Sequence, residues 1–285
     1  MPQCWTRKAA AAGASLLGLG LPLSLSACGS GSGSPPHGQH AHLTDSGRHH
    51  TKGSKPASGG SSTTTSTTPA VVAGANGQVT VLEIGDSLGE DLGFGLQWAF
   101  SKDAKVHFVA AAVGDTGLAN TNYYDWAAHL NTELHTYHPQ VVVVFLGAND
   151  DQGFDVGSEV ASVGSALWSS QYSKRVGILM SEATSAGARV LWVGMPIMES
   201  PSFSAHVVVE NSIYSAEASS HQGATYYPSW PLFVTASGGF NGGDSSASGV
   251  AQPLRQPDGI HLAQGGEDML AADVVAEMKT LYKLP

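Results

Sequence analysis

The chain has 285 residues, of which 42% are hydrophobic and 13% are charged, and its formal net charge at pH 7 is −10. This acidic balance disfavours binding to the phosphate backbone of a nucleic acid. Only two cysteines are present, Cys4 and Cys28, and both lie near the N-terminus. A disulfide needs two cysteines in the mature chain, so we expect none in the folded part.

The first 28 residues resemble the leader of a bacterial lipoprotein. Arg7 and Lys8 precede an apolar run that is too short and too rich in small residues for a membrane-spanning helix. The run ends in Leu25-Ser26-Ala27-Cys28, which resembles a lipobox. The resemblance implies that the signal peptide 1–27 is cleaved and that lipid on Cys28 anchors the exported protein to the cell membrane. The alternative is a secreted protein with a chance cysteine.

Residues 28–78 have the composition of a flexible tether. Gly and Ser recur through the segment, and Ser61–Pro69 consists of Ser and Thr closed by Pro. Such a segment has too little apolar surface to offset its ordering entropy, so we expect a coil that spans about 40 Å. Its histidines lack the regular spacing of a structural zinc site, although weak metal binding stays an alternative. They are His37, His40, His42, His49 and His50.

From residue 79 onward, segments typical of strands alternate with segments typical of helices. The apolar run 140–146 is continuous, as in a strand buried on both faces. The segment 124–138 has helical character and stops at Pro139, whereas three consecutive valines make a helix at 206–221 ambiguous. The expected strands are 79–84, 106–113, 140–146, 189–193 and 224–227, and the expected helices are 89–100, 124–138, 169–185, 206–221 and 262–282.

This alternation predicts an α/β fold, in which a central parallel sheet carries helices on both faces. In sheets of this kind the functional site lies at the carboxyl ends of the strands. The residues that directly follow each strand are therefore the first candidates for a functional site.

Three of the expected strands are followed by a motif with reactive or donating groups. Ser87, in the sequence Gly-Asp-Ser-Leu, leaves a strand and enters a helix, which exposes its hydroxyl near the positive helix end. Gly114, in Gly-Asp-Thr, lets a ligand approach the backbone N–H. Asn149, in Gly-Ala-Asn-Asp, has an amide that can donate to a developing oxyanion. Alone, each is more often a helix cap or a turn residue.

An aspartate and a histidine three residues apart precede the last expected helix. Asp258 can hold one imidazole nitrogen of His261 while the other nitrogen faces a nucleophile. His261 alone would more often be an ordinary residue at a helix start. However, the four motifs occur in order, each after a strand or before the final helix, and chance explains such a set poorly.

Together the motifs resemble the four sequence blocks of the SGNH (GDSL) hydrolases. The resemblance implies a flavodoxin-like three-layer α/β/α domain over residues 79–285. It also implies that Ser87 is the nucleophile and that His261 is the general base, oriented by Asp258. The matching segments are GDSL 85–88, GDT 114–116, GAND 147–150 and DGIH 258–261, and the stretches YYDW 123–126, GANDDQG 147–153 and LWVGMP 191–196 resemble an exported bacterial subgroup.

The resemblance further implies an oxyanion hole and no metal or organic cofactor. Its donors would be the backbone N–H groups of Ser87 and Gly114 and the side chain of Asn149. The chain departs from many members at Ala112, where they carry Asn. Gly117 competes with Gly114 for the donor role.

The sequence therefore predicts a serine esterase that acts on short-chain or O-acetyl esters, such as an O-acetylated glycan, at the bacterial cell envelope. Three alternatives stay open: an O-acyltransferase with the same triad, a non-catalytic envelope binding lipoprotein, and a lipoprotein that scavenges metal through its histidine-rich tether. Aromatic residues near the site could bind a sugar ring, although core packing is favoured for the tryptophans at 126 and 230. They are Tyr123, Tyr124, Trp126, Trp168 and Trp230.

Overall fold

The computed structural model describes residues 70–243 and 252–284. The predicted signal peptide 1–27, the lipidation site Cys28 and the tether up to residue 69 lie outside the described residues. The end of the predicted tether, 70–78, contacts the domain: the Val71 backbone N–H donates to the Tyr282 carbonyl oxygen at 2.9 Å. The folded part therefore includes residues before the expected start at 79.

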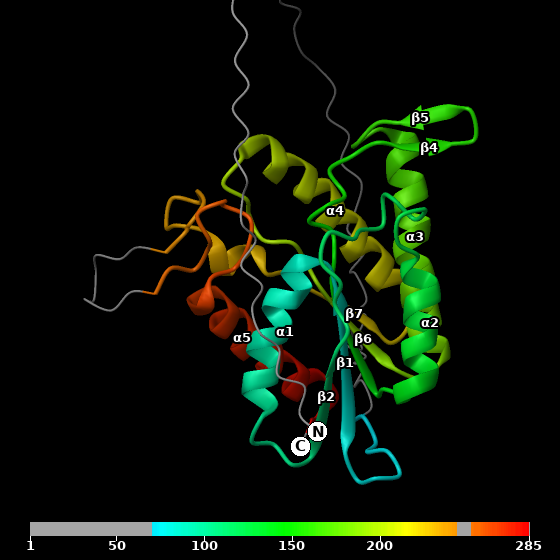
Figure 1. The fold of residues 1–285 in the computed structure, drawn as a ribbon, viewed down its shortest axis with the longest axis vertical. Helices are drawn as coiled ribbons and strands as arrows, with labels where there is room; N and C mark the ends of the chain where they lie inside the picture. The colour runs from blue at the N-terminus through cyan, green and yellow to red at the C-terminus, as the bar shows by residue number, and fades with distance from the viewer. Residues whose placement is uncertain (1–69, 244–251, 285) are drawn as a thin grey trace, which may run out of the picture. The chain divides into compact units, whose positions relative to one another are not determined.

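A five-stranded parallel sheet forms the centre of the domain (Figure 1). The strand order β2-β1-β3-β6-β7 is the flavodoxin-like order, as the resemblance to the SGNH hydrolases implies. Every residue of the central strands β1 and β3 is buried, which explains their continuous apolar runs. The strands are β1 (Val79–Gly85), β2 (Val106–Ala110), β3 (Val141–Phe145), β6 (Arg189–Val193) and β7 (Ala224–Tyr227).

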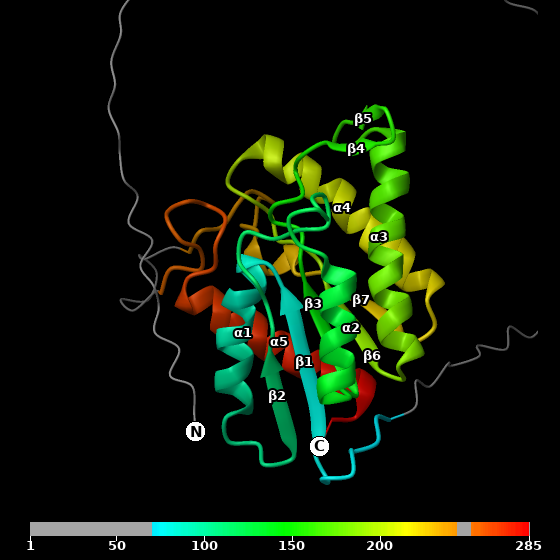
Figure 2. The same cartoon turned by 45° about the vertical axis from the view of Figure 1, so that its right-hand side comes forward.

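Helices cover both faces of this sheet and complete the three-layer arrangement. Helices α1 and α5 pack together on one face, and α2, α3 and α4 lie on the other (Figure 2). The core consists of the apolar faces of these helices and the buried strands. The helices are α1 (Ser87–Phe100), α2 (Trp126–Tyr137), α3 (Ala166–Ser185), α4 (Pro201–Ser220) and α5 (Gln264–Tyr282).

The structure differs from the expected elements mainly at helix starts and in one insertion. Helix α4 includes the three valines and begins earlier than expected, because Ser200 caps it and Pro201 occupies its first turn. An antiparallel hairpin of β4 (Phe154–Val156) and β5 (Glu159–Ala161) was not predicted, since three-residue strands leave almost no periodic pattern. A short 3₁₀ helix at Trp230–Phe233 was not predicted either, because its four residues are too few to show a helical pattern.

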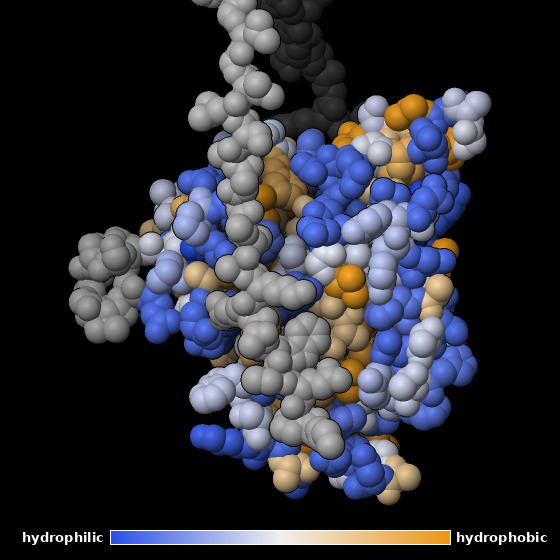
Figure 3. Space-filling model, viewed as in Figure 1, coloured by the Kyte–Doolittle hydropathy of each residue, from blue (hydrophilic) through white to orange (hydrophobic). Residues whose placement is uncertain are grey.

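Hydrophilic residues cover most of the surface over α2 and α3 in the view of Figure 3. Some large apolar side chains are exposed singly, such as Ile178 on α3 and Val208 on α4. Of the helices that the structure describes, none combines the length and the apolar character that a membrane crossing requires.

We expect Gly85→Ala to destabilise the domain. A Cβ at residue 85 would overlap the Phe145 carbonyl oxygen and lie 2.8 Å from the Gly89 Cα. Both are backbone atoms of packed elements, so relief requires a shift of β3 or α1, and we expect a loss of about 2 kcal/mol or more in the free energy of unfolding. Urea unfolding measures this loss.

Gly239→Ala is the matched control for this substitution. Its Cβ would have only the Thr235 Oγ1 nearby, at 3.6 Å. We expect a change below about 0.5 kcal/mol for the control. Equal unfolding free energies for the two variants would contradict the close packing of β1, β3 and α1.

Candidate active site

Ser87 stands at the carboxyl end of β1, in the first turn of α1. Asp86 caps the helix, and its carboxylate accepts from the Leu88 backbone N–H at 2.9 Å. Backbone N–H groups in a first helical turn have no acceptor within the helix. The Ser87 N–H therefore lies beside its own hydroxyl at the positive end of the helix.

The three residues of the predicted triad form one hydrogen-bonded chain. The Ser87 Oγ lies 2.9 Å from the His261 Nε2, and the His261 Nδ1 lies 2.7 Å from the Asp258 Oδ2. With the proton on Nδ1, the imidazole donates to Asp258 and accepts from the Ser87 hydroxyl. The structure thus brings together the three residues that the sequence nominated, from segments more than 170 positions apart.

Hydrogen bonds keep the Asp258 carboxylate ionised. Partial burial opposes the charge, but the His261 ring and the backbone N–H groups of Ile260 and His261 all donate to it. These bonds outweigh burial and lower the pKa of Asp258 below its ordinary value. The carboxylate can therefore orient the imidazole and stabilise its protonated form.

Two buried charged residues hold the turn that carries Asp258 and His261. Arg255 is 4% exposed, and its guanidinium donates to the Gly259 and Ile260 carbonyl oxygens at 3.3 and 2.5 Å. Asp91, on α1, accepts from the Leu262 backbone N–H at 2.8 Å. The turn is therefore tied to the same helix that carries Ser87. Nothing in the sequence patterns marked Arg255 or Asp91.

The predicted oxyanion donors are placed together but are not all free. The Asn149 Nδ2 donates to the Thr116 carbonyl oxygen at 2.9 Å, and an amide nitrogen has a second hydrogen for a ligand. The Gly114 N–H, in contrast, donates to the Glu90 Oε1 at 3.0 Å. The sequence prediction treated this N–H as available, and it is occupied here because Glu90 projects from the next turn of α1 after Ser87.

Asp86 and Asp150 join the loops that surround Ser87. Asp86 accepts from the Gly147 and Ala148 N–H groups at 2.8 and 2.7 Å, so the helix that carries Ser87 is tied to the loop that carries Asn149. Burial raises the pKa of Asp86 to about 7, although these N–H groups and that of Leu88 oppose the rise. An aspartate before a helix start is a recognisable cap signal, but its bonds to the loop after β3 have no sequence signature.

Asp150 connects the loops after β2 and β3. Its carboxylate accepts from the Leu118 and Ala119 N–H groups at 2.9 and 2.6 Å and from the Tyr172 hydroxyl at 2.7 Å. A Cβ at Gly117 would collide with this carboxylate. Gly117 therefore permits a close packing contact, which accounts for its presence without a donor role.

Two of the five candidate sugar-binding aromatic residues are buried. Trp126 and Trp168 are fully enclosed, and the Trp126 Nε1 donates to the Thr116 Oγ1 at 3.1 Å. Trp230 is partly buried against the core. Tyr123 is 65% exposed and is the most exposed of the five.

A second serine–histidine pair on the surface lacks the remaining parts of a catalytic site. The Ser181 Oγ lies 3.0 Å from the His221 Nε2. However, Ser181 lies inside α3, where backbone N–H groups are used by the helix and none is left to bind an oxyanion. This pair therefore provides a control for the pair at Ser87.

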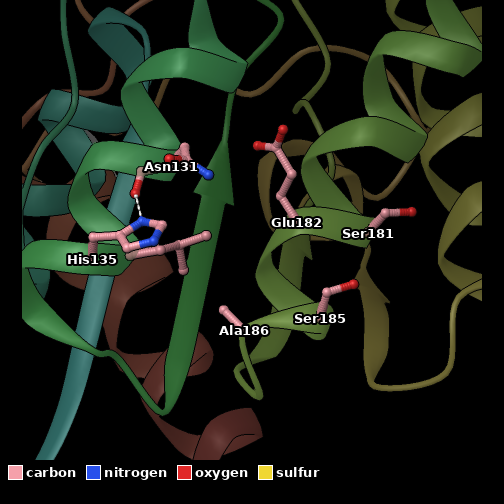
Figure 4. Close-up of a pocket in the computed structure, with 7 residues that line it drawn as sticks. Asn131, His135, Ser181, Glu182, Ser185 and Ala186 are labelled. Carbon is pink, nitrogen blue, oxygen red and sulfur yellow. Dashed lines mark hydrogen bonds between the residues drawn. The ribbon is translucent and has the colours of Figure 1, made fainter.

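The pocket between α2 and α3 also contains no triad residue. Asn131 and His135 line it from α2, and Ser181, Glu182 and Ser185 line it from α3 (Figure 4). Within residues 70–243 and 252–284, no group of three or more His, Cys, Asp or Glu side chains is arranged to hold a metal ion.

We expect Asp91→Asn to change how stability depends on pH. Burial is the main cause that raises the pKa of Asp91 to about 7, so between about pH 4 and pH 7 the folded protein binds a proton that the unfolded chain releases. Stability from this group is therefore complete at low pH and is lost as pH rises. Asparagine keeps an oxygen for the Leu262 N–H and removes the titration.

Urea unfolding at about pH 5 and about pH 8 tests this expectation. Between the two pH values, the free energy of unfolding of the wild type should fall by about 1–3 kcal/mol more than that of the variant. Equal losses would contradict the burial of a titrating carboxyl group at this position.

Comparisons with known proteins agree with the fold. Residues 80–277 match the family described as "Protein of unknown function (DUF459)". No curated protein matches the chain at a significant level. Among solved structures, the chain is similar to TesA, with 23% identity, a TM-score of 0.50, and coverage of 71% of this chain and 99% of that one.

Two further solved structures are similar. One is LAE5, described as an alpha/beta hydrolase enzyme from the metagenome of Lake Arreo, with 16% identity, a TM-score of 0.52, and coverage of 71% of this chain and 96% of that one. The other is a GDSL-like lipase from Bacteroides thetaiotaomicron, with 12% identity, a TM-score of 0.51, and coverage of 73% and 92%. The chain has the SGNH hydrolase fold and belongs to the DUF459 family.

Proposed function

We propose that this protein is a serine esterase that hydrolyses carboxylic esters, with Ser87 as nucleophile, His261 as general base and Asp258 as its orienting carboxylate. The observation that carries the proposal is the hydrogen-bonded chain of these three side chains at the start of α1. The neighbouring Asn149 amide supplies a donor where negative charge would develop.

The proposed reaction has two steps. The Ser87 Oγ attacks the ester carbonyl carbon while its proton passes to the His261 Nε2, and the oxygen anion is held by the Ser87 N–H and the Asn149 amide. His261 then gives the proton to the leaving alcohol oxygen, the ester C–O bond breaks and an acyl-serine forms. Water attacks the acyl-serine, loses a proton to His261 and releases the acid, and Ser87 recovers its proton.

The substrate is proposed to be a short-chain or O-acetyl ester at the cell envelope. The leader that resembles a lipoprotein signal and the Gly/Ser/Thr-rich segment support an exported domain held near the membrane. The net charge of −10 favours a neutral ester over a polyanion. An O-acetylated glycan combines this neutrality with an extracytoplasmic location.

We expect Ser87→Ala to abolish ester hydrolysis. Without the nucleophile no acyl-enzyme can form, so kcat/KM for p-nitrophenyl acetate should fall at least about 1,000-fold. Comparison with p-nitrophenyl octanoate measures acyl chain preference, and we expect the acetate to be the better substrate. Initial rates followed by p-nitrophenol release give both values.

Ser181→Ala is the control, because Ser181 also contacts a histidine but has no free helical N–H groups. It should retain wild-type rates. Full activity of folded Ser87→Ala, or loss of activity in Ser181→Ala alone, would overturn the assignment of the nucleophile.

We further propose that Cys28 carries a lipid anchor. Full-length protein expressed in a bacterium with a lipoprotein pathway should sediment with membranes, because two or more acyl chains give stable attachment. Cys28→Ser should move it to the soluble fraction, whereas Cys4→Ser should leave it with the membranes. An unchanged distribution of Cys28→Ser would contradict the anchor.

A further inference from the structure

Glu90 occupies the Gly114 backbone N–H, the third predicted oxyanion donor beside the Ser87 N–H and the Asn149 amide. Its Oε1 accepts from the Gly114 N–H at 3.0 Å. A Cβ at Gly114 would lie 3.3 and 3.4 Å from the two carboxylate oxygens, so the whole carboxylate rests against this glycine. The position is fixed by α1, on which Glu90 follows Ser87 by three residues, close to one helical turn.

An ester cannot use the Gly114 N–H while Glu90 holds it. A backbone N–H carries one hydrogen, so the substrate carbonyl oxygen has to displace the carboxylate before all three donors can bind the oxyanion. A carboxylate that stayed in place would also repel the negative charge that forms on the substrate oxygen. Use of the Gly114 N–H as a third oxyanion donor therefore requires Glu90 to exchange its partner.

The surroundings of Glu90 make an unpaired carboxylate unfavourable. Glu83 and Asp91 lie nearby, and the charge of Glu90 adds to the effect of burial in raising the pKa of both. Among the described residues, no Lys, Arg or His nitrogen pairs with the Glu90 carboxylate. A displaced Glu90 is partly exposed and has acidic neighbours on the protein side, so a hydroxyl of the substrate can offer it a hydrogen bond in place of water.

We propose that Glu90 is a selectivity residue, which favours esters that carry a free hydroxyl next to the ester group. In the productive complex the ester carbonyl oxygen accepts from the Gly114 N–H, and the neighbouring hydroxyl of the alcohol part donates to Glu90. A plain alkyl ester displaces Glu90 without providing a donor, so the enzyme binds the transition state for its hydrolysis less tightly. This inference rests on the proposed function and names its substrate class: monoesters of polyhydroxy compounds such as partly acylated sugars.

A matched pair of small esters tests the proposal. 2-Hydroxyethyl acetate and propyl acetate differ only in a hydroxyl that replaces a methyl group. We expect wild-type kcat/KM to be about tenfold or more higher for the hydroxy ester, because a site that hydrogen-bonds a substrate hydroxyl discriminates strongly against its absence. The release of acetic acid, titrated at constant pH, measures both rates without a chromogenic group.

Glu90→Ala should remove this preference. In this variant the Gly114 N–H is free for any ester, so kcat/KM for propyl acetate should rise about tenfold. The ratio of the kcat/KM values for the two esters should then approach one. Glu90→Gln keeps the shape of the side chain and loses the charge, and its ratio should also fall by at least about threefold. The second variant keeps the test valid where Glu90→Ala fails to fold.

The outcomes separate this inference from the proposed function. Hydrolysis of both esters with the same ratio in the wild type and in both variants overturns the role of Glu90 and leaves the esterase intact. An equal fall of both rates in the variants also overturns it, because Glu90 would then support the site without reading the hydroxyl. Absence of hydrolysis in the wild type, towards these esters and the p-nitrophenyl esters, overturns the proposed function and this inference with it.

Discussion

The site depends on one buried carboxylate, that of Asp86. It binds N–H groups from two places at once, Leu88 in α1 and the Gly147–Ala148 backbone after β3. These bonds are possible because β1 and β3 are parallel neighbours whose carboxyl ends meet at the same edge of the sheet. Since α1 carries Ser87 and the β3 loop carries Asn149, Asp86 sets the distance between the proposed nucleophile and an oxyanion donor.

Three acidic residues are buried near the same edge of the sheet. Glu83, Asp86 and Asp150 are fully buried, and burial raises the pKa of each. Asp86 and Asp150 are satisfied by backbone N–H groups, whereas both oxygens of Glu83 lack a partner among the described residues. Burial favours the neutral form of these acids, whereas Glu90, the acid beside the predicted oxyanion donor Gly114, is partly exposed.

The sequence predicted those features of the fold that arise from a repeating pattern of residue types or from a local capping rule. The valine run of β3 and the helix start at Ser87 are visible as patterns, and the parallel order of strands follows from their alternation with helices. The triad was nominated because its members stand in recognisable motifs. Three features have no such motif: the bond from Gly114 to Glu90, the anchoring of the Asp258 turn by Arg255, and the bonds of Asp86 to the loop after β3. Each is a long-range contact of single residues. Such contacts depend on how loops meet in space and leave no periodic signal.

The central claim is that His261 and Asp258 activate Ser87 and no other serine. Labelling of the protein with a fluorophosphonate, followed by mass spectrometry of its peptides, tests it directly because the reagent needs an activated hydroxyl and no knowledge of the substrate. The account predicts one adduct on Ser87 and a labelling rate at least about 100-fold lower in His261→Ala. An adduct on a different serine, or an undiminished rate in His261→Ala, would contradict it.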